Sequence, residues 1–270
     1  MESPYVTNPT HPTLRRLAQQ LLLIRCAPDK ASAVRQMVPD PAAVDPAERI
    51  GDMAAIPGRS ERPLLVHPSQ LKTRAVGTRE GRGALIHALA HIEANAIDLA
   101  LDATWRFDGM PERFYLDWLQ VAREEALHFQ LLRSHLQEMG YDYGDFPAHD
   151  GLWEMAEKTK GDLLARLALV PRTLEARGLD ASPAIRNKLI SVGDRRGADI
   201  LALILRDEIG HVAIGNHWYR HLCTLRGLEP GSTYAALSSA YDAPRLKGPF
   251  NLAARRAAGF DEAELAQLCT

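Results

Sequence analysis

The sequence lacks the features that mark several common classes of protein. It has three cysteines in 270 residues, scattered along the chain and without a C-x-x-C pair, which argues against a disulfide framework and a cysteine-based zinc site. It also lacks an excess of basic residues. The formal net charge is −2, so we expect no general attraction to nucleic acid or to a membrane surface.

Long apolar segments are also missing. The longest apolar runs, such as those at 21–24 and 200–205, are far too short to span a bilayer. Residues 1–12 are polar, contain three prolines and lack the basic start and apolar run of a secretory signal. We therefore expect an extended N-terminal arm and a cytoplasmic protein without a membrane span.

The sequence does contain a repeated Glu-x-x-His pattern. Glu208 and His211 lie three residues apart in an apolar, helix-compatible stretch, and Glu125 and His128 have the same spacing upstream. Residues three apart on a helix lie on one face. Burying an ionised group without a partner is costly, and a metal ion is one partner that removes this cost. The pattern therefore indicates a metal site.

Each Glu-x-x-His has a lone helical glutamate upstream of it. Glu93 precedes Glu125 by 32 positions, and Glu175 precedes Glu208 by 33. At about 1.5 Å per residue, such a gap fits a long helix, a turn and a return to the same height. Four helices would then bring six ligands to one level of a bundle, the arrangement of di-iron and di-manganese carboxylate proteins. The predicted metal ligands are Glu93, Glu125, His128, Glu175, Glu208 and His211.

Some positions in this scheme have alternatives. Glu154 and Glu157 lie upstream of Glu175 and are rivals for its place. Glu124 and Asp207 directly precede the ligating glutamates and lie one turn from the histidine of their own helix, where each could accept a hydrogen bond from a ligating imidazole or form only a surface pair. No catalytic residue beyond the ligands is identified.

The ligand chemistry indicates the metal. Carboxylates and imidazoles are hard and intermediate donors, which suit iron or manganese and also accept zinc. Four carboxylates neutralise two divalent ions. We therefore expect two iron ions, with manganese or zinc as alternatives.

Periodicity predicts an all-α chain. Long helices are expected at 84–107, 112–139, 152–177 and 194–225, and shorter ones at 13–27, 30–38, 47–56, 180–192, 234–241 and 261–268. Pro171 should distort the third long helix one turn before Glu175. His87 and His91 lie roughly 200° around the first long helix from Glu93, so we expect them to form structural hydrogen bonds rather than to bind metal. The expected organisation is a helical extension over 1–70, the bundle over 71–228 and a tail over 229–270.

The ordered ligand set resembles that of the ferritin-like superfamily. Residues 71–229 resemble an uncharacterised bacterial ferritin-like family related to the tRNA-modifying di-iron hydroxylase, and Gly248-Pro249-Phe250-Asn251, with Ala253, Arg255 and Ala258-Gly259-Phe260, resembles the tail of that family. The resemblance implies a ferritin-like four-helix bundle with an N-terminal helical extension and a C-terminal wrapping tail. It also implies a non-haem di-iron centre that reacts with oxygen or peroxide.

The function expected from this resemblance is that of an oxidoreductase or hydroxylase acting on an unidentified small molecule with an electron donor. The alternative is a metal-handling or oxidant-scavenging protein without an organic substrate. A tRNA substrate would need a basic face, and the overall charge gives this little support. Candidates for such a face are Lys72, Arg74, Arg79, Arg82, Arg195, Arg196 and Arg206. The basic cluster at 72–82 is otherwise expected to be a solvated loop.

Overall fold

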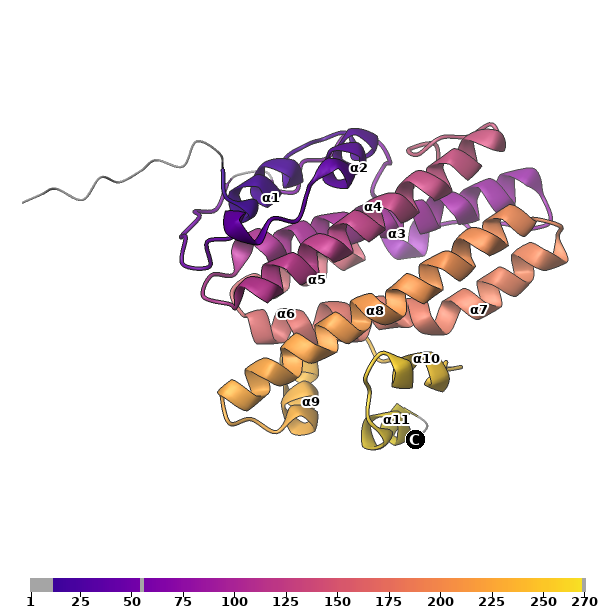
Figure 1. Cartoon of the computed structure of the whole chain (residues 1–270). Coiled ribbons are helices and arrows are strands. Elements are labelled where there is room, and N and C mark those ends of the chain that lie inside the picture. The colour runs from indigo at the N-terminus through magenta and orange to yellow at the C-terminus, as the bar shows by residue number, and fades with distance from the viewer. Residues whose placement is uncertain (1–11, 54–55, 269–270) are drawn as a thin grey trace, which may run out of the picture.

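The computed structural model describes residues 12–53 and 56–268 (Figure 1). The predicted N-terminal arm lies outside these residues, apart from Pro12. Within the described ranges the chain is helical, and its one β-type contact is an isolated parallel bridge between Leu65 and Ala148. The prediction of an all-α chain is therefore confirmed for this part of the protein.

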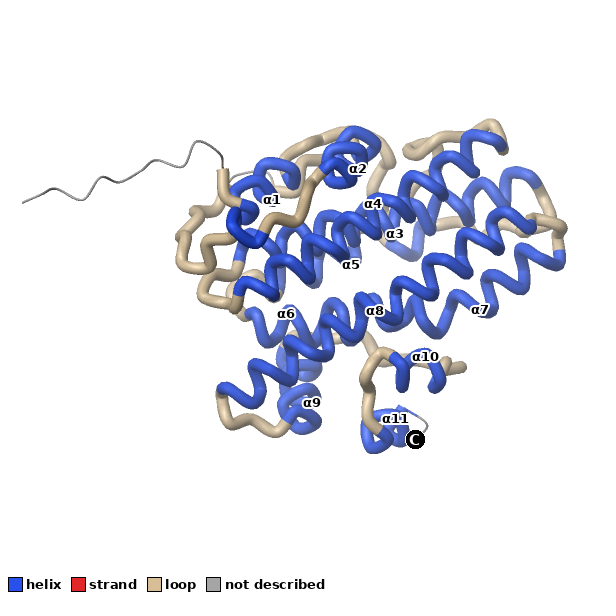
Figure 2. The backbone as a smooth tube through the Cα atoms, viewed as in Figure 1, coloured by secondary structure: helices blue, strands red, loops and turns tan. Residues whose placement is uncertain are grey.

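Two helical hairpins form the bundle. The first pairs α3 (Arg79–Arg106) with α4 (Glu112–Glu138), and the second pairs α7 (Ala176–Ser191) with α8 (Arg195–Leu225). Short turns join the members of each pair, and Figure 2 shows the paired helices lying side by side. The helix α4 also packs on α8, which joins the two hairpins.

The third bundle helix differs from its predicted course. The segment predicted as one helix over 152–177 breaks after α5 (Gly151–Lys158), and a new helix starts at α6 (Leu163–Leu169). The break has a local cause, because the Asp162 side chain accepts a hydrogen bond from the backbone N–H of Leu164 and caps the new helix.

The new helix also continues further than predicted. It runs through the π-helical segment Val170–Glu175 into α7, so the separate helix expected at 180–192 belongs to it. Gly178 does not end the helix, since a glycine inside a helix costs only about 1 kcal/mol and the burial of Leu179 and Leu189 outweighs it. Glu175 thus lies in the middle of a long element rather than near its end.

The distortion expected at Pro171 is present as the π-helical segment. Pro171 has no N–H to donate to the preceding turn, and within the segment the Thr173 hydroxyl donates to the carbonyl of Ala168, 2.8 Å away. The neighbouring helix α8 approaches this segment closely at Gly215, where a Cβ would lie 2.5 Å from the Pro171 Cβ. A glycine at this point of α8 therefore makes room for the distorted turn.

The N-terminal extension covers the first hairpin. Its helices α1 (Leu14–Leu22) and α2 (Ala27–Gln36) pack on α3 and α4, respectively, and two short 3-10 turns follow, η1 (Pro41–Ala43) and η2 (Pro68–Gln70).

The prediction of a helix over 47–56 is wrong for residues 47–53 and 56, the part that the structure describes, because these residues form an irregular strip. The Arg15 guanidinium donates to the backbone carbonyls of Asp45, Pro46 and Glu48. An extended strip of chain can present these three carbonyls to one side chain, whereas a helix would use them internally.

The tail covers the second hairpin. It contains α9 (Pro230–Ala240), α10 (Leu252–Ala257), which was not predicted, and α11 (Glu262–Leu268). Apolar residues of the tail pack against α7 and α8 in a second small core. The Arg172 guanidinium of the π-helical segment lies 4.5 Å from the ring centre of Tyr219 and 5.1 Å from that of Phe260, so the tail is docked directly on the distorted turn.

The helix α3 is long and apolar enough to cross a membrane by composition, but 78% of its most apolar window is buried inside the structure. Because this window is mostly buried, we interpret α3 as the core helix of the bundle.

The contact between Gly215 and Pro171 leads to a prediction. Gly215→Ala should lower the free energy of unfolding by about 1–3 kcal/mol, because the added methyl overlaps a proline ring that cannot rotate away. Gly210→Ala is the matched control on the same helix, since a Cβ there meets nothing within 4 Å. It should leave stability unchanged or raise it by up to about 1 kcal/mol. Urea unfolding followed by circular dichroism measures both, and equal effects would contradict the close contact.

Candidate metal centre

Five of the six predicted ligands form two groups that share one glutamate. Glu93 of α3 lies with Glu125 and His128 of α4, and Glu125 lies also with Glu208 and His211 of α8. Within each group, one ligand atom from every residue lies within 4.8 Å of the others. All five residues are buried, and the most exposed of them, Glu208, is 7% exposed. Each group has the residues and spacing to hold a metal ion.

Both imidazoles direct the same nitrogen at the shared glutamate. Nδ1 of His128 is 3.2 Å from Oε2 of Glu125 and 3.2 Å from Oε2 of Glu93. Nδ1 of His211 is 2.9 Å from Oε1 of Glu125 and 3.9 Å from Oε2 of Glu208. The two oxygens of Glu125 thus face one imidazole each, as expected of a carboxylate that bridges two ions.

The interior of the site holds buried polar atoms without a hydrogen-bond partner. Two of them are Oε2 of Glu175 and Oε2 of Glu208; the other two, Oε1 of Glu125 and Nδ1 of His211, form an ion pair at 2.9 Å but without hydrogen-bond geometry. A buried polar atom without a partner is unusual and costs about 1–3 kcal/mol. These four atoms belong to four of the six predicted ligands, and all are donor types that bind iron, manganese or zinc. The donor set therefore fits a pair of metal ions.

Glu175 is less closely placed than the other five. It belongs to neither three-residue group, and its residue is partly exposed although its Oε2 is buried. Glu175 nevertheless interacts electrostatically with the site, because burial and then the charge of Glu125 raise the pKa of Glu175 to about 8. Its rivals lie elsewhere: Glu154 is exposed on α5, and Glu157 pairs with Lys160. Glu175 remains the better candidate for the sixth ligand.

The site concentrates opposing charges in a dry interior. Burial and then Glu125 raise the pKa of Glu93 to about 8 and that of Glu208 well above its usual range. Burial also disfavours the ionised form of Glu125, but the imidazoles outweigh it and hold the pKa of Glu125 well below its usual range. Hydrogen bonds with Glu125 and Glu93 overcome burial and raise the pKa of His128 to about 11. Without metal, protons therefore supply the positive charge that this cluster requires.

The Nε2 atom of each imidazole contacts a carboxylate from the other helix of the α4–α8 pair. The prediction paired Glu124 and Asp207 with the histidine of their own helix. Instead, Nε2 of His211 on α8 lies 2.7 Å from Glu124 on α4, and Nε2 of His128 on α4 lies 3.1 Å from Asp207 on α8. Nε2–H donates to a carboxylate in each case, so once the imidazole loses its second proton, Nδ1 would carry the lone pair that points into the site.

Two neighbouring residues hold these carboxylates and were missed by sequence reasoning. Gln120, one turn before Glu124, donates a hydrogen bond to it, and Arg206 donates to Asp207. The only signal for Gln120 was its spacing of four residues, which is common on exposed helix faces. Such supporting contacts are recognisable only once the two helices are placed together.

The other polar groups considered from sequence have structural partners. Nε2 of His87 accepts a hydrogen bond from the Gly144 backbone, and Nδ1 of His91 lies 2.9 Å from the Tyr143 hydroxyl. In the basic cluster at 72–82, three arginines pair with Glu80, the Met139 carbonyl and the Gly77 carbonyl; they are Arg74, Arg79 and Arg82, respectively. The contacts of Arg74 and Arg82 are local, and that of Arg79 joins the start of α3 to the end of α4.

Comparisons with known proteins identify a family. A family model described as "Protein of unknown function (DUF455)" matches residues 23–266. An uncharacterised protein of Haemophilus influenzae is 50% identical over 221 residues, which cover 79% of this chain and 76% of the relative. No solved structure matches the chain.

The raised pKa values predict that metal binding releases protons. Glu93 and Glu175, each with a pKa of about 8, and His128, with a pKa of about 11, are mostly protonated in the metal-free protein at neutral pH. The metal must displace these protons, so its affinity should rise as the pH increases from about 6 to 9. Calorimetric titration in buffers of different ionisation enthalpy measures the release. An affinity independent of pH would contradict the proposed ligands.

The exchanged pairs lead to a second prediction. Asp207→Asn should weaken metal binding by about 10- to 100-fold, because it weakens the acceptor behind a ligating imidazole. In a double-mutant cycle, Asp207→Asn should add little to His128→Ala but should add its full effect to His211→Ala. Competition with a chelator measures each affinity. The control is Asp199→Asn, at an exposed position on the same helix. Coupling of Asp207 to His211 rather than to His128 would contradict the observed pairing of Asp207 with the imidazole of the other helix.

Proposed function

The chain belongs to the DUF455 family, and we propose that it is a ferritin-like di-metal carboxylate protein. The observation that carries the proposal is the symmetric use of Glu125: each of its oxygens faces the Nδ1 of one imidazole, and each imidazole is held from behind by a carboxylate of the opposite helix. A structural ion pair would not need two imidazoles on one fully buried carboxylate together with further unpartnered carboxylate oxygens. The helical hairpins and the duplicated Glu-x-x-His support the relation to ferritin-like proteins.

The metal we propose is iron, with two ions per chain and manganese or zinc as alternatives. The residues that would hold the ions are Glu93, Glu125, His128, Glu175, Glu208 and His211. Oxygen and nitrogen donors without thiolate suit these metals. The four carboxylates carry the charge that neutralises two divalent ions. Bound ions would offset the burial, and then the charge of Glu125, that raise the pKa of Glu93 and Glu208.

The activity we propose is that of an oxidoreductase dependent on oxygen or peroxide, of the hydroxylase type. A bound pair of ferrous ions supplies the electrons that reduce the oxidant. The chain itself excludes bulk water, since the five grouped ligands are at most 7% exposed. Glu124 and Asp207 hold the Nε2 protons, and their side chains are 31% and 14% exposed, so they also connect the imidazoles with solvent.

A second candidate is an oxidant-scavenging or metal-handling role without an organic substrate. The burial of the grouped ligands favours it, because a dry and closed site admits a small oxidant more easily than a large substrate. The long extensions at both ends disfavour assembly into a storage cage. A cytoplasmic location suits either role, since Cys26 and Cys223 are both free.

A tRNA substrate has less support than a small molecule. Arg196 pairs with Glu138 and Arg206 with Asp207, and most of the basic cluster at 72–82 is also engaged in internal hydrogen bonds. Carboxylates thus neutralise three of the seven candidates, Arg74, Arg196 and Arg206, which weakens the phosphate-binding face that RNA needs. The electron donor and the organic substrate are proposed only as small molecules of unidentified structure.

Metal analysis tests the proposal. The purified protein should contain about two ions per chain, and Glu208→Ala or His128→Ala should lose metal while the helical circular dichroism signal persists. Glu154→Ala, at an exposed glutamate on α5, is the control and should retain both ions. Metal that stays bound when Glu125 is replaced by alanine would overturn the assignment.

Oxygen uptake separates the two candidate roles. With iron and a reductant, both roles predict oxygen or peroxide consumption that His128→Ala abolishes. Turnover that is stimulated by a small organic molecule, with oxygen incorporated into it, would support the hydroxylase. Consumption that no organic molecule changes would favour scavenging, and a particle the size of a cage on gel filtration would indicate storage.

A further inference from the structure

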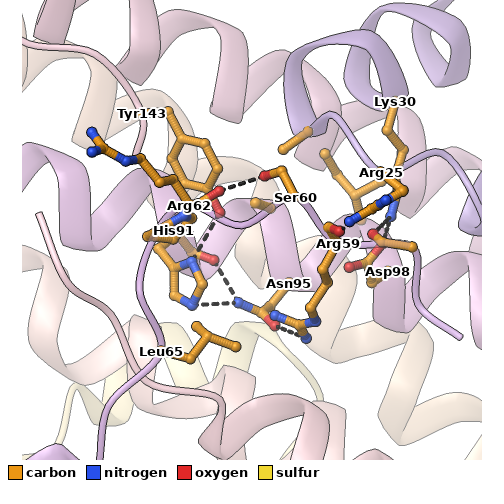
Figure 3. A pocket seen from close by; sticks show the side chains of 15 residues that line it. Arg25, Lys30, Arg59, Ser60, Arg62, Leu65, His91, Asn95, Asp98 and Tyr143 are labelled. Atoms are coloured by element: carbon orange, nitrogen blue, oxygen red, sulfur yellow. Dashed lines mark hydrogen bonds and ion pairs between the residues drawn. The ribbon is translucent and has the colours of Figure 1, made fainter. Parts of the chain in front are cut away.

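A cavity lies between the N-terminal extension and α3 (Figure 3). Its volume is about 40 Å³, room for roughly three water-sized groups. One wall is formed by Arg25, Lys30 and the strip from Gly58 to Leu65, and the other by α3 residues from His91 to Asp98 together with Tyr143.

The cavity is separate from the candidate metal centre. His91, Asn95 and Asp98 line it, whereas Glu93 belongs to the metal-binding group. At 100° per residue, these three side chains lie about 140–200° around α3 from Glu93. One helix therefore presents the candidate metal ligand on one face and the cavity wall on the opposite face.

The lining is rich in positive charge. It contains four basic residues, Arg25, Lys30, Arg59 and Arg62, and one carboxylate, Asp98. Lys30 forms a buried ion pair with Asp98, and Arg59 pairs with Asp150 and donates to Asn95. These two pairs balance their own charges, but both contacts of Arg59 use Nη2, which leaves its Nε and Nη1 hydrogens for a ligand.

The charges that remain are those of Arg25 and Arg62. Arg25 donates one hydrogen bond, from Nε to the backbone carbonyl of Arg59, 2.9 Å away. In Figure 3 the Arg25 and Arg59 side chains gather with Lys30 on one side of the cavity, while the Arg62 guanidinium points away from them. Arg25 therefore brings a positive charge to the cavity without a carboxylate to neutralise it.

Most hydrogen-bond acceptors in the cavity wall already accept a hydrogen bond from a neighbouring residue. The Asn95 side-chain oxygen accepts from Arg59, and the carbonyls of Gly58 and Arg62 accept from Lys30 and Ser60. Burial lowers the pKa of His91 to about 4, so its imidazole is neutral. Ala27, the first residue of α2, also lines the cavity, and no side chain caps this helix N-terminus, which adds partial positive charge.

We propose that this cavity binds the phosphoryl group of a small molecule through the guanidinium groups of Arg25 and Arg59. A tetrahedral oxyanion matches the cavity in size, and guanidinium groups bind phosphate oxygens through paired, charge-assisted hydrogen bonds. Arg25, Ser60 and Arg62 are exposed, so the remainder of a phosphorylated ligand can extend outward. The site does not depend on the metal centre.

Phosphate titration tests the proposal. Full-length protein is titrated with inorganic phosphate and with glycerol 3-phosphate at constant ionic strength, with chloride as the reference anion, and binding is followed by calorimetry and thermal unfolding. We expect saturable binding that raises the unfolding temperature. Tighter binding of the ester would identify a phosphorylated metabolite, and equal or weaker binding would identify free phosphate. No saturable binding of either anion would overturn the proposal.

Variants locate the binding. Arg25→Gln should weaken it at least about tenfold, because it removes a charge-assisted hydrogen-bond donor. Arg25 is exposed and makes a single hydrogen bond to the backbone, so this variant should fold. Arg59→Lys keeps the charge but removes the guanidinium fork and should also weaken binding. Lys72→Gln removes an exposed charge outside the cavity and is the control; equal losses in all three variants would overturn the assigned site.

Phosphate also binds to exposed metal ions, so the titration is repeated after chelator treatment and in His128→Ala. Binding in the cavity should survive both, because His128 and Arg25 lie in different parts of the structure. Binding that disappears with the metal would overturn the inference while leaving the proposed di-metal function intact. Conversely, metal-free protein that still binds phosphate would support the cavity even if the di-metal proposal failed.

Discussion

The ionised carboxylate of Glu125, fully buried at the centre of the bundle, is the constraint on which the rest of the structure depends. An isolated buried charge costs several kcal/mol, and it persists only with close partners. Two imidazoles supply that partnership here, one from the same helix and one from α8. Satisfying this carboxylate therefore requires that α4 and α8 pack together, and it brings the two hairpins into one bundle with a fixed register.

The π-helical segment meets a second requirement of the same centre. In the proposed centre the fourth carboxylate is Glu175, which lies on a helix that also packs closely against α8. Pro171 breaks the regular hydrogen-bond ladder one turn before Glu175, and Gly215 gives the distorted turn the space that any side chain would occupy. Arg172 of this segment lies against the rings of Tyr234 and Phe260 from the tail and of Tyr219 from α8, so contacts with both the tail and the bundle stabilise the distorted turn.

Most of the long helices were predictable from periodicity, and the grouping of five ligands from two spacings: three residues within each Glu-x-x-His, and the 32 residues between Glu93 and Glu125. Helix ends were less predictable, because the continuation of α7 past Gly178 depends on the burial of Leu179 and Leu189. The irregular strip near Glu48 depends on a side chain more than thirty residues away, Arg15. The exchange of Glu124 and Asp207 between imidazoles depends on how two helices are placed side by side, which spacing along one helix does not contain.

The N-terminal extension explains how α3 can be polar on its second face and still lie at the centre of the protein. His91, Asn95, Asp98 and Asp102 are all buried there, and such groups are stable in an interior only when each has a partner. Partners come from the extension for two of them, because Lys30 pairs with Asp98 and Arg59 donates to Asn95. The extension thus converts an otherwise exposed polar helix face into a closed wall, and the basic cavity is the space left where that wall is incomplete.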